Sequence, residues 1–110
     1  AVEPLRFPKC RPGPALGVFE ESVYPLCRSP LARHDLIMLY TDGLYEVEGA
    51  TGEEYGADRL LAAVRQRAAL PVDQLFDELL ADIQQYAGKQ GFVDDVCLVG
   101  AEVVRVGSAE

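Results

Sequence analysis

Several features common in enzymes and nucleic-acid-binding proteins are scarce in this chain of 110 residues. His34 is the sole histidine, so neither a His-based catalytic triad nor a histidine-rich zinc cluster can form within one chain. The three cysteines, Cys10, Cys27 and Cys97, lack the close C-x-x-C spacing of a zinc or redox site. Only 10 basic residues stand against 18 acidic ones, and a net charge of −8 disfavours binding to nucleic acid or anionic lipid.

Long apolar runs are also missing. The longest run is far below the roughly 18 residues that a membrane span requires, and the N-terminus lacks the apolar stretch of a signal peptide. We therefore expect a cytoplasmic location without membrane insertion. The absence of an initiating Met predicts that the chain is an excised piece of a longer polypeptide. The length suits one domain or part of one, and the composition of 49% apolar and 25% charged residues is that of a folded globular protein.

Five short segments have the composition of strands. Four prolines in residues 1–14 predict an irregular entry segment before them. Two segments follow as a loose hairpin, with Pro25 favouring an edge position, and "LIMLY" is a continuously apolar run typical of a strand covered on both faces. Two more complete the chain. The five segments are residues 15–19, 23–27, 36–40, 96–100 and 101–106.

Two amphipathic helices are expected between the third and fourth of these segments. From about Ala57 the apolar residues recur with helical spacing, and a second helix begins at Pro71 and ends at Gly88. The short break between them predicts an antiparallel pair. The whole pattern predicts an α+β fold, with about five mostly antiparallel strands and two antiparallel helices packed on one face of the sheet.

Acidic residues stand at the ends of two predicted strands. Asp42 follows the strand of residues 36–40, the helices carry the chain away and back, and Asp94 precedes the next strand at the same end. If the two strands are antiparallel neighbours, roughly 4.8 Å apart, both carboxylates can bind one ion. Mg²⁺ and Mn²⁺ prefer such oxygen ligands and would relieve the repulsion between the acids. Asp95 adds a third carboxylate, although alternation along a strand would point it away from Asp94.

The same residues also have a simpler interpretation. Asp-Gly is a common turn dipeptide, and an acid pair before a strand is often a solvated turn. Gly43 has two interpretations as well: either the turn requires a positive φ there, or the backbone approaches a metal-bound water closely. Local patterns alone leave these alternatives open.

Taken together and in order, the motifs resemble a known family. The segments "DLIMLYTDGLYEVEGATGEEYGADRLLAAV" and "GFVDDVCLVGAEV" are similar to the C-terminal half of the PPM-type metal-dependent serine/threonine protein phosphatases, particularly the bacterial SpoIIE/RsbU-like branch. The upstream "PALGVFEESVYP" resembles the "PLGV" segment of that branch. The similarity extends from Pro14 to Val104. It implies the αββα layered sandwich of that family, with residues 1–110 forming the C-terminal portion of one phosphatase domain.

The resemblance also implies a site and an activity. Asp42 and Asp94 match the acids that bind the catalytic Mn²⁺ or Mg²⁺ ions of the family, and Gly43 and Asp95 match residues beside those ligands. The implied reaction is hydrolysis of a phosphoserine or phosphothreonine ester, in which two metal ions activate water and no protein nucleophile is needed. The suggested substrate is a phosphorylated protein, such as an anti-sigma-factor antagonist in bacterial partner switching.

Some parts of the family pattern are absent or altered. The other metal-binding aspartates belong to an N-terminal half that this sequence does not contain, so we expect weak metal binding and little activity from this piece alone. Tyr45 stands where the branch often has Thr, and Val93 and Cys97 replace two threonines near the acid pair. The alternative is a non-catalytic regulatory module that keeps the scaffold and binds a partner, such as an anti-sigma-factor antagonist. An open sheet edge or face would also suit formation of a homo-oligomer or addition of a strand. A third option is a simple acidic cation-binding domain.

Overall fold

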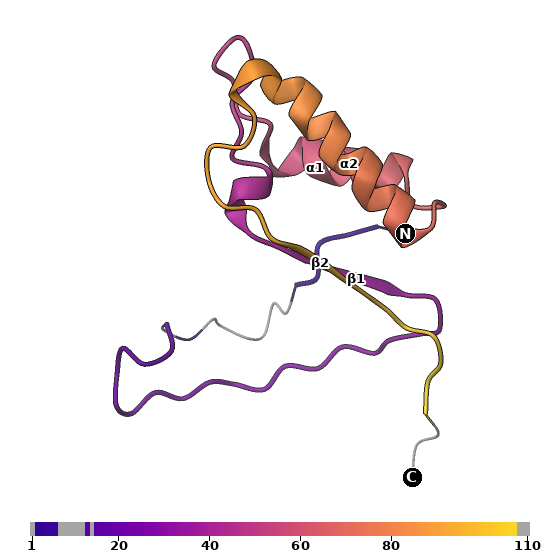
Figure 1. Cartoon of the computed structure of the whole chain (residues 1–110). Helices are drawn as coiled ribbons and strands as arrows, with labels where there is room; N and C mark the ends of the chain where they lie inside the picture. The colour runs from indigo at the N-terminus through magenta and orange to yellow at the C-terminus, as the bar shows by residue number, and fades with distance from the viewer. Residues whose placement is uncertain (1, 7–12, 14, 108–110) are drawn as a thin grey trace.

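The computed structural model describes residues 2–6, 13 and 15–107. Figure 1 shows two helices packed together on one side of a two-stranded sheet, which confirms the predicted α+β class. Where the sequence predicted five strands, the described residues contain two. The predicted irregular segment 1–14 lies for the most part outside the described residues. In chain order the elements are β1 (Leu36–Tyr40), η1 (Asp42–Leu44), α1 (Gly56–Gln66), α2 (Val72–Ala87), η2 (Gly88–Gln90) and β2 (Leu98–Glu102).

The sheet pairs the two strands that the acids flank. β1 and β2 are antiparallel, with Met38 opposite Gly100 and Tyr40 opposite Leu98, so the predicted pairing is confirmed. Beyond the far end of the ladder, the Val103 N–H donates to the Asp35 carbonyl oxygen at 2.8 Å. Because the Tyr40–Leu98 pair ends the ladder, the chain leaves β1 and enters β2 at the same edge of the sheet.

The remaining strand predictions differ from the structure. Residues 15–19 and 23–27 form no strand, and Val23 is 88% exposed. In the described part of the chain, no strand lies beside them to pair with their backbone N–H and C=O groups. The predicted strands 96–100 and 101–106 are replaced by the single strand β2. No turn interrupts the chain at Gly100, since this residue pairs with Met38 in the middle of the ladder.

The helices supply most of the core and cover one face of the sheet. The buried residues of α2 recur at helical spacing as Leu75, Leu79, Ile83 and Ala87. Pro71 directly precedes the helix and Gly88 follows it with a φ of 63°, as the sequence predicted for its two ends within one residue. A Cβ atom at Gly100 would lie 2.8 Å from Cζ of Phe76, so the absence of a side chain lets α2 approach the sheet closely.

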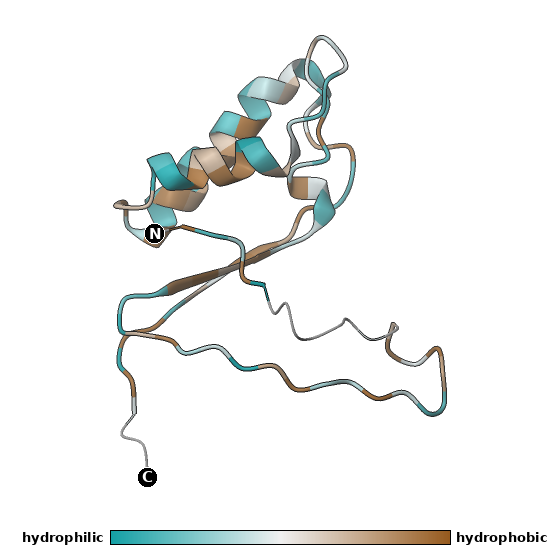
Figure 2. Ribbon diagram, turned by 180° about the vertical axis from the view of Figure 1, so that it is seen from behind, coloured by the Kyte–Doolittle hydropathy of each residue, from teal (hydrophilic) through white to brown (hydrophobic). Residues whose placement is uncertain are grey.

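The other face of the sheet remains open. Alternation places Leu39 and Val99 on the face opposite Gly100, and these side chains are 64% and 50% exposed. Figure 2 shows hydrophobic residues along both paired strands. No helix among the described residues is long and apolar enough to cross a membrane.

Hydrogen bonds fix the loop between η1 and α1 against the helices. Tyr55 is buried at the start of α1, and its hydroxyl donates to Asp82 Oδ2 on α2 at 2.7 Å. The Tyr55 ring meets Tyr86 edge-on, with 5.3 Å between centroids, and the Arg59 guanidinium lies 4.9 Å from the centroid of Tyr86. Burial, together with the hydrogen bond to Asp82, raises the pKa of Tyr55. The loop is therefore tied to both helices, and it carries the chain from η1 into the core.

Candidate metal centre

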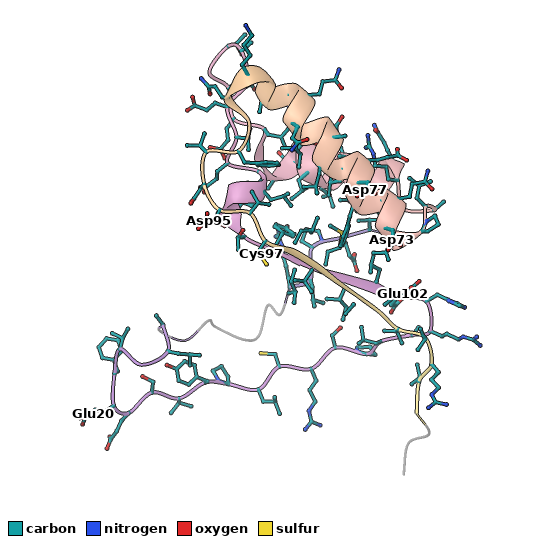
Figure 3. The ribbon with its side chains drawn as sticks, in the orientation of Figure 1. Glu20, Asp73, Asp77, Asp95, Cys97 and Glu102 are labelled. Carbon is teal, nitrogen blue, oxygen red and sulfur yellow. The ribbon has the colours of Figure 1, made fainter. Side chains whose placement is uncertain are left out.

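The two predicted ligands flank the paired ends of β1 and β2. Asp42 begins η1 two residues after the end of β1, and Asp94 lies four residues before β2. Figure 3 shows Asp95 beside η1, with Cys97 following it toward β2. The excursion through α1 and α2 therefore returns the acid pair to the edge where Asp42 lies. This juxtaposition of segments is the arrangement that the sequence predicted, and the metal-binding role of the two acids stays a prediction.

Thr41 joins the two segments by three hydrogen bonds. Its backbone N–H donates to the Cys97 carbonyl oxygen at 3.0 Å, and its Oγ1 accepts from the Cys97 N–H at 3.0 Å. The same Oγ1 donates to the Asp95 carbonyl oxygen at 3.3 Å. The Thr41 hydroxyl thus extends the hydrogen bonding between the two segments beyond the last residue pair of the sheet. No motif in the sequence predicts this role of Thr41, and its only local signal is a hydroxyl residue at the end of a strand.

Gly43 brings the backbones into direct contact. A Cβ atom at this position would overlap the Asp95 carbonyl oxygen and lie 3.2 Å from the Asp95 carbonyl carbon. Its φ is not among the positive values of the described glycines, so conformational freedom is not the reason for glycine here. A close approach is therefore observed at Gly43, and its partner is the backbone of Asp95. The approach to a metal-bound water stays a prediction.

The acidic side chains at this edge are exposed and held by different partners. Asp42 Oδ1 accepts a hydrogen bond from the Tyr45 hydroxyl at 3.0 Å. Asp94 Oδ1 accepts one from the backbone N–H of Asp95 at 2.8 Å, which fixes the carboxylate at the start of its turn. The hydrogen bond to Asp42, followed by weaker burial and charge effects, raises the pKa of Tyr45. Both carboxylates are thus oriented by the protein before any ion is bound.

The side chains at this edge supply some of the ligands that a divalent cation requires. Asp42 and Asp94 offer exposed carboxylate oxygens, the ligands that Mg²⁺ and Mn²⁺ prefer. The described part of the chain contains no group of three or more histidine, cysteine or acidic side chains arranged to hold an ion. A cation with near-octahedral coordination would need further oxygen ligands from water or from other protein segments.

Away from the acidic residues at this edge, a depression of about 430 Å³ lies between α1 and α2. Its polar walls include Arg59, Asp82 and Tyr86. Arg59 forms an ion pair with Glu53 at 3.1 Å and donates to the Tyr86 hydroxyl at 2.9 Å, while Asp82 accepts from Tyr55. These groups are already paired with one another, so they serve the packing of the helices and offer little to a ligand.

A protein-family model matches most of the chain. The family described as "Stage II sporulation protein E (SpoIIE)" matches residues 4–104. The chain therefore belongs to the SpoIIE family, of the PPM phosphatase type. Neither the curated proteins nor the solved structures contained a significant match.

Proposed function

We propose that this chain is the C-terminal part of a metal-dependent phosphoserine/phosphothreonine protein phosphatase domain. The observation that supports this most strongly is the contact between η1 and the Asp94–Asp95 segment, made through Gly43 and Thr41. This contact lies within the segment that matches the SpoIIE family. It puts the acid of the T-D-G motif and the acid pair of the F-x-D-D motif at one edge of the sheet.

In this proposal Asp42 and Asp94 hold Mn²⁺ or Mg²⁺ through carboxylate oxygens. Bound divalent ions supply Lewis acidity and neutralise charge on a phosphoryl group. The protein contributes the spacing: Gly43 lets η1 lie against Asp95, and the Asp95 N–H orients the Asp94 carboxylate. Further ligands from the N-terminal half of the domain would complete the two-metal site.

Metal binding by matched variants tests the proposal. Isothermal titration of the chain with Mn²⁺ should show binding that Asp42→Asn and Asp94→Asn each abolish. Asp77→Asn is the control, because it removes the same charge from an exposed position on α2. Figure 3 shows Asp77 well separated from Asp95. Binding that survives either of the first two substitutions would contradict the assignment.

The alternative is a non-catalytic module that binds a partner through the retained scaffold. The exposed sheet face with Leu39 and Val99 favours it, because such a face can receive a partner. This alternative predicts that partner binding proceeds without Mn²⁺ and is unaffected by Asp42→Asn. The phosphatase proposal predicts that Mn²⁺-dependent hydrolysis of a phosphoserine peptide by the complete domain is lost in that variant.

The biological setting is part of the same proposal. We place the protein in bacterial signalling, with a phosphorylated anti-sigma-factor antagonist as the substrate class and the cytoplasm as its location. Membership of the SpoIIE family supports the signalling role. Incubation with a phosphorylated antagonist, followed by mass spectrometry of the phosphoserine peptide, tests the substrate assignment.

A further inference from the structure

The hydrogen bond between Tyr45 and Asp42 has no counterpart at Asp94. The Tyr45 hydroxyl donates to Asp42 Oδ1 at 3.0 Å across the single turn of η1. Asp94 is instead oriented by a backbone N–H, that of Asp95. A side chain three residues away, and not the backbone, therefore orients the Asp42 carboxylate.

The Tyr45 residue is itself held in place from several directions. Its backbone N–H donates to the Asp42 carbonyl oxygen at 3.1 Å, and its carbonyl oxygen accepts from the Gly56 N–H at 3.0 Å. The ring meets Tyr40 of β1 edge-on, with 6.1 Å between centroids and an angle of 85° between planes. The ring also packs against the hydrophobic core. These contacts restrict the conformation of the Tyr45 side chain and hold its hydroxyl beside Asp42.

We propose that Tyr45 is a positioning residue that fixes the Asp42 carboxylate in the orientation required to bind a divalent cation. The hydrogen bond engages Oδ1, so we assign Oδ2 to the cation. An exposed carboxylate must otherwise lose rotational freedom when it binds a metal, and a partner that orders it beforehand removes that cost. The inference rests on the proposed function, because it requires Asp42 to be a metal ligand.

The Tyr45→Phe variant tests this role while keeping the ring against Tyr40 and the core. Manganese titration followed by electron paramagnetic resonance should show that the variant binds Mn²⁺ roughly tenfold more weakly than the unsubstituted chain. This is the size of effect expected when a residue that orients a metal ligand is lost. In the metal-free protein, the ¹³Cγ resonance of Asp42 should shift, because its hydrogen bond is lost. Thermal unfolding should confirm that the variant remains folded.

Two controls separate this role from general effects. Tyr40→Phe removes the neighbouring hydroxyl of the same ring pair and should leave both the Mn²⁺ affinity and the Asp42 resonance unchanged. Asp42→Asn should abolish binding. If Asp42→Asn abolishes binding while Tyr45→Phe binds as well as the parent chain or better, the positioning role is overturned and the proposed function stands. If Asp42→Asn leaves binding intact, or the parent chain does not bind Mn²⁺, both are overturned.

Discussion

Replacing Gly43 by alanine perturbs the contact that brings the two acid-bearing segments together. The Cβ atom of the variant would overlap the Asp95 carbonyl oxygen and lie 3.5 Å from the Asp94 carbonyl carbon. These are backbone atoms of a segment anchored by Thr41, so they cannot move aside as a flexible side chain would. Relief requires the whole segment to move away from η1, which would separate Asp42 from Asp94.

The energetic cost can be estimated from two opposing effects. Inserting a methyl group into a packed contact costs about 1–3 kcal/mol. Alanine also restricts the unfolded chain, which stabilises the fold by about 0.4–1 kcal/mol. Because the overlap is with backbone atoms, we take a cost of about 2–2.5 kcal/mol from the first range. The net loss for Gly43→Ala is then about 1–2 kcal/mol in the free energy of unfolding. For a chain of this size, that corresponds to a decrease in Tm of roughly 4–8 °C.

Urea and thermal unfolding measure this loss directly. Gly107→Ala is the matched control, because no atom of the described residues lies within 4 Å of the position that its Cβ would take. The control should change the free energy of unfolding by less than about 0.5 kcal/mol. Equal stability of the two variants would refute the argument that Gly43 is required by the Asp95 backbone.

Three further substitutions test the packing around the site. Thr41→Val should lower the free energy of unfolding, measured in urea, by about 1–2 kcal/mol. The reason is that the Asp95 carbonyl and the Cys97 N–H lose their hydrogen-bond partner. Thr41→Ser keeps the hydroxyl and should retain most of the stability. Leu79→Ala should cost about 2–5 kcal/mol by the same measurement, because Leu79 is fully buried. Tyr55→Phe should alter the pH dependence of stability. The fold raises the pKa of Tyr55, so its contribution is complete below the ordinary tyrosine pKa of about 10 and is lost as pH rises above it. Urea midpoints between pH 8 and pH 11 should therefore fall less steeply in the variant, and parallel profiles would contradict the assignment.

The helices and β1 could be predicted because their signals are local. The spacing of Leu75, Leu79 and Ile83 defines the buried face of α2, and a proline and a glycine stand at its two ends. The apolar run 36–40 corresponds residue for residue to β1. The pairing of β1 with the strand after Asp94 could also be predicted. Two helices that carry the chain away from one edge of the sheet and back to it allow few other arrangements of the two strands.

The predictions that differed depended on partners distant in sequence. Residues 15–19 and 23–27 have strand composition, but a strand also requires a neighbour, which composition cannot supply. The roles of Thr41 and Gly43 arise from contacts with Asp95, more than fifty positions later. The Tyr45 hydrogen bond is local, yet in the sequence this residue stands out only as a departure from threonine.

The central claim is that Asp42 and Asp94 contribute oxygen to the same divalent ion, and paramagnetic broadening tests it most directly. In a ¹⁵N-labelled sample, substoichiometric Mn²⁺ should selectively broaden the amide resonances of residues 41–45 and 94–97 together, because both segments would lie next to one bound ion. Broadening confined to one of these segments, or centred on the acids of α2 such as Asp73 and Asp77, would contradict the account.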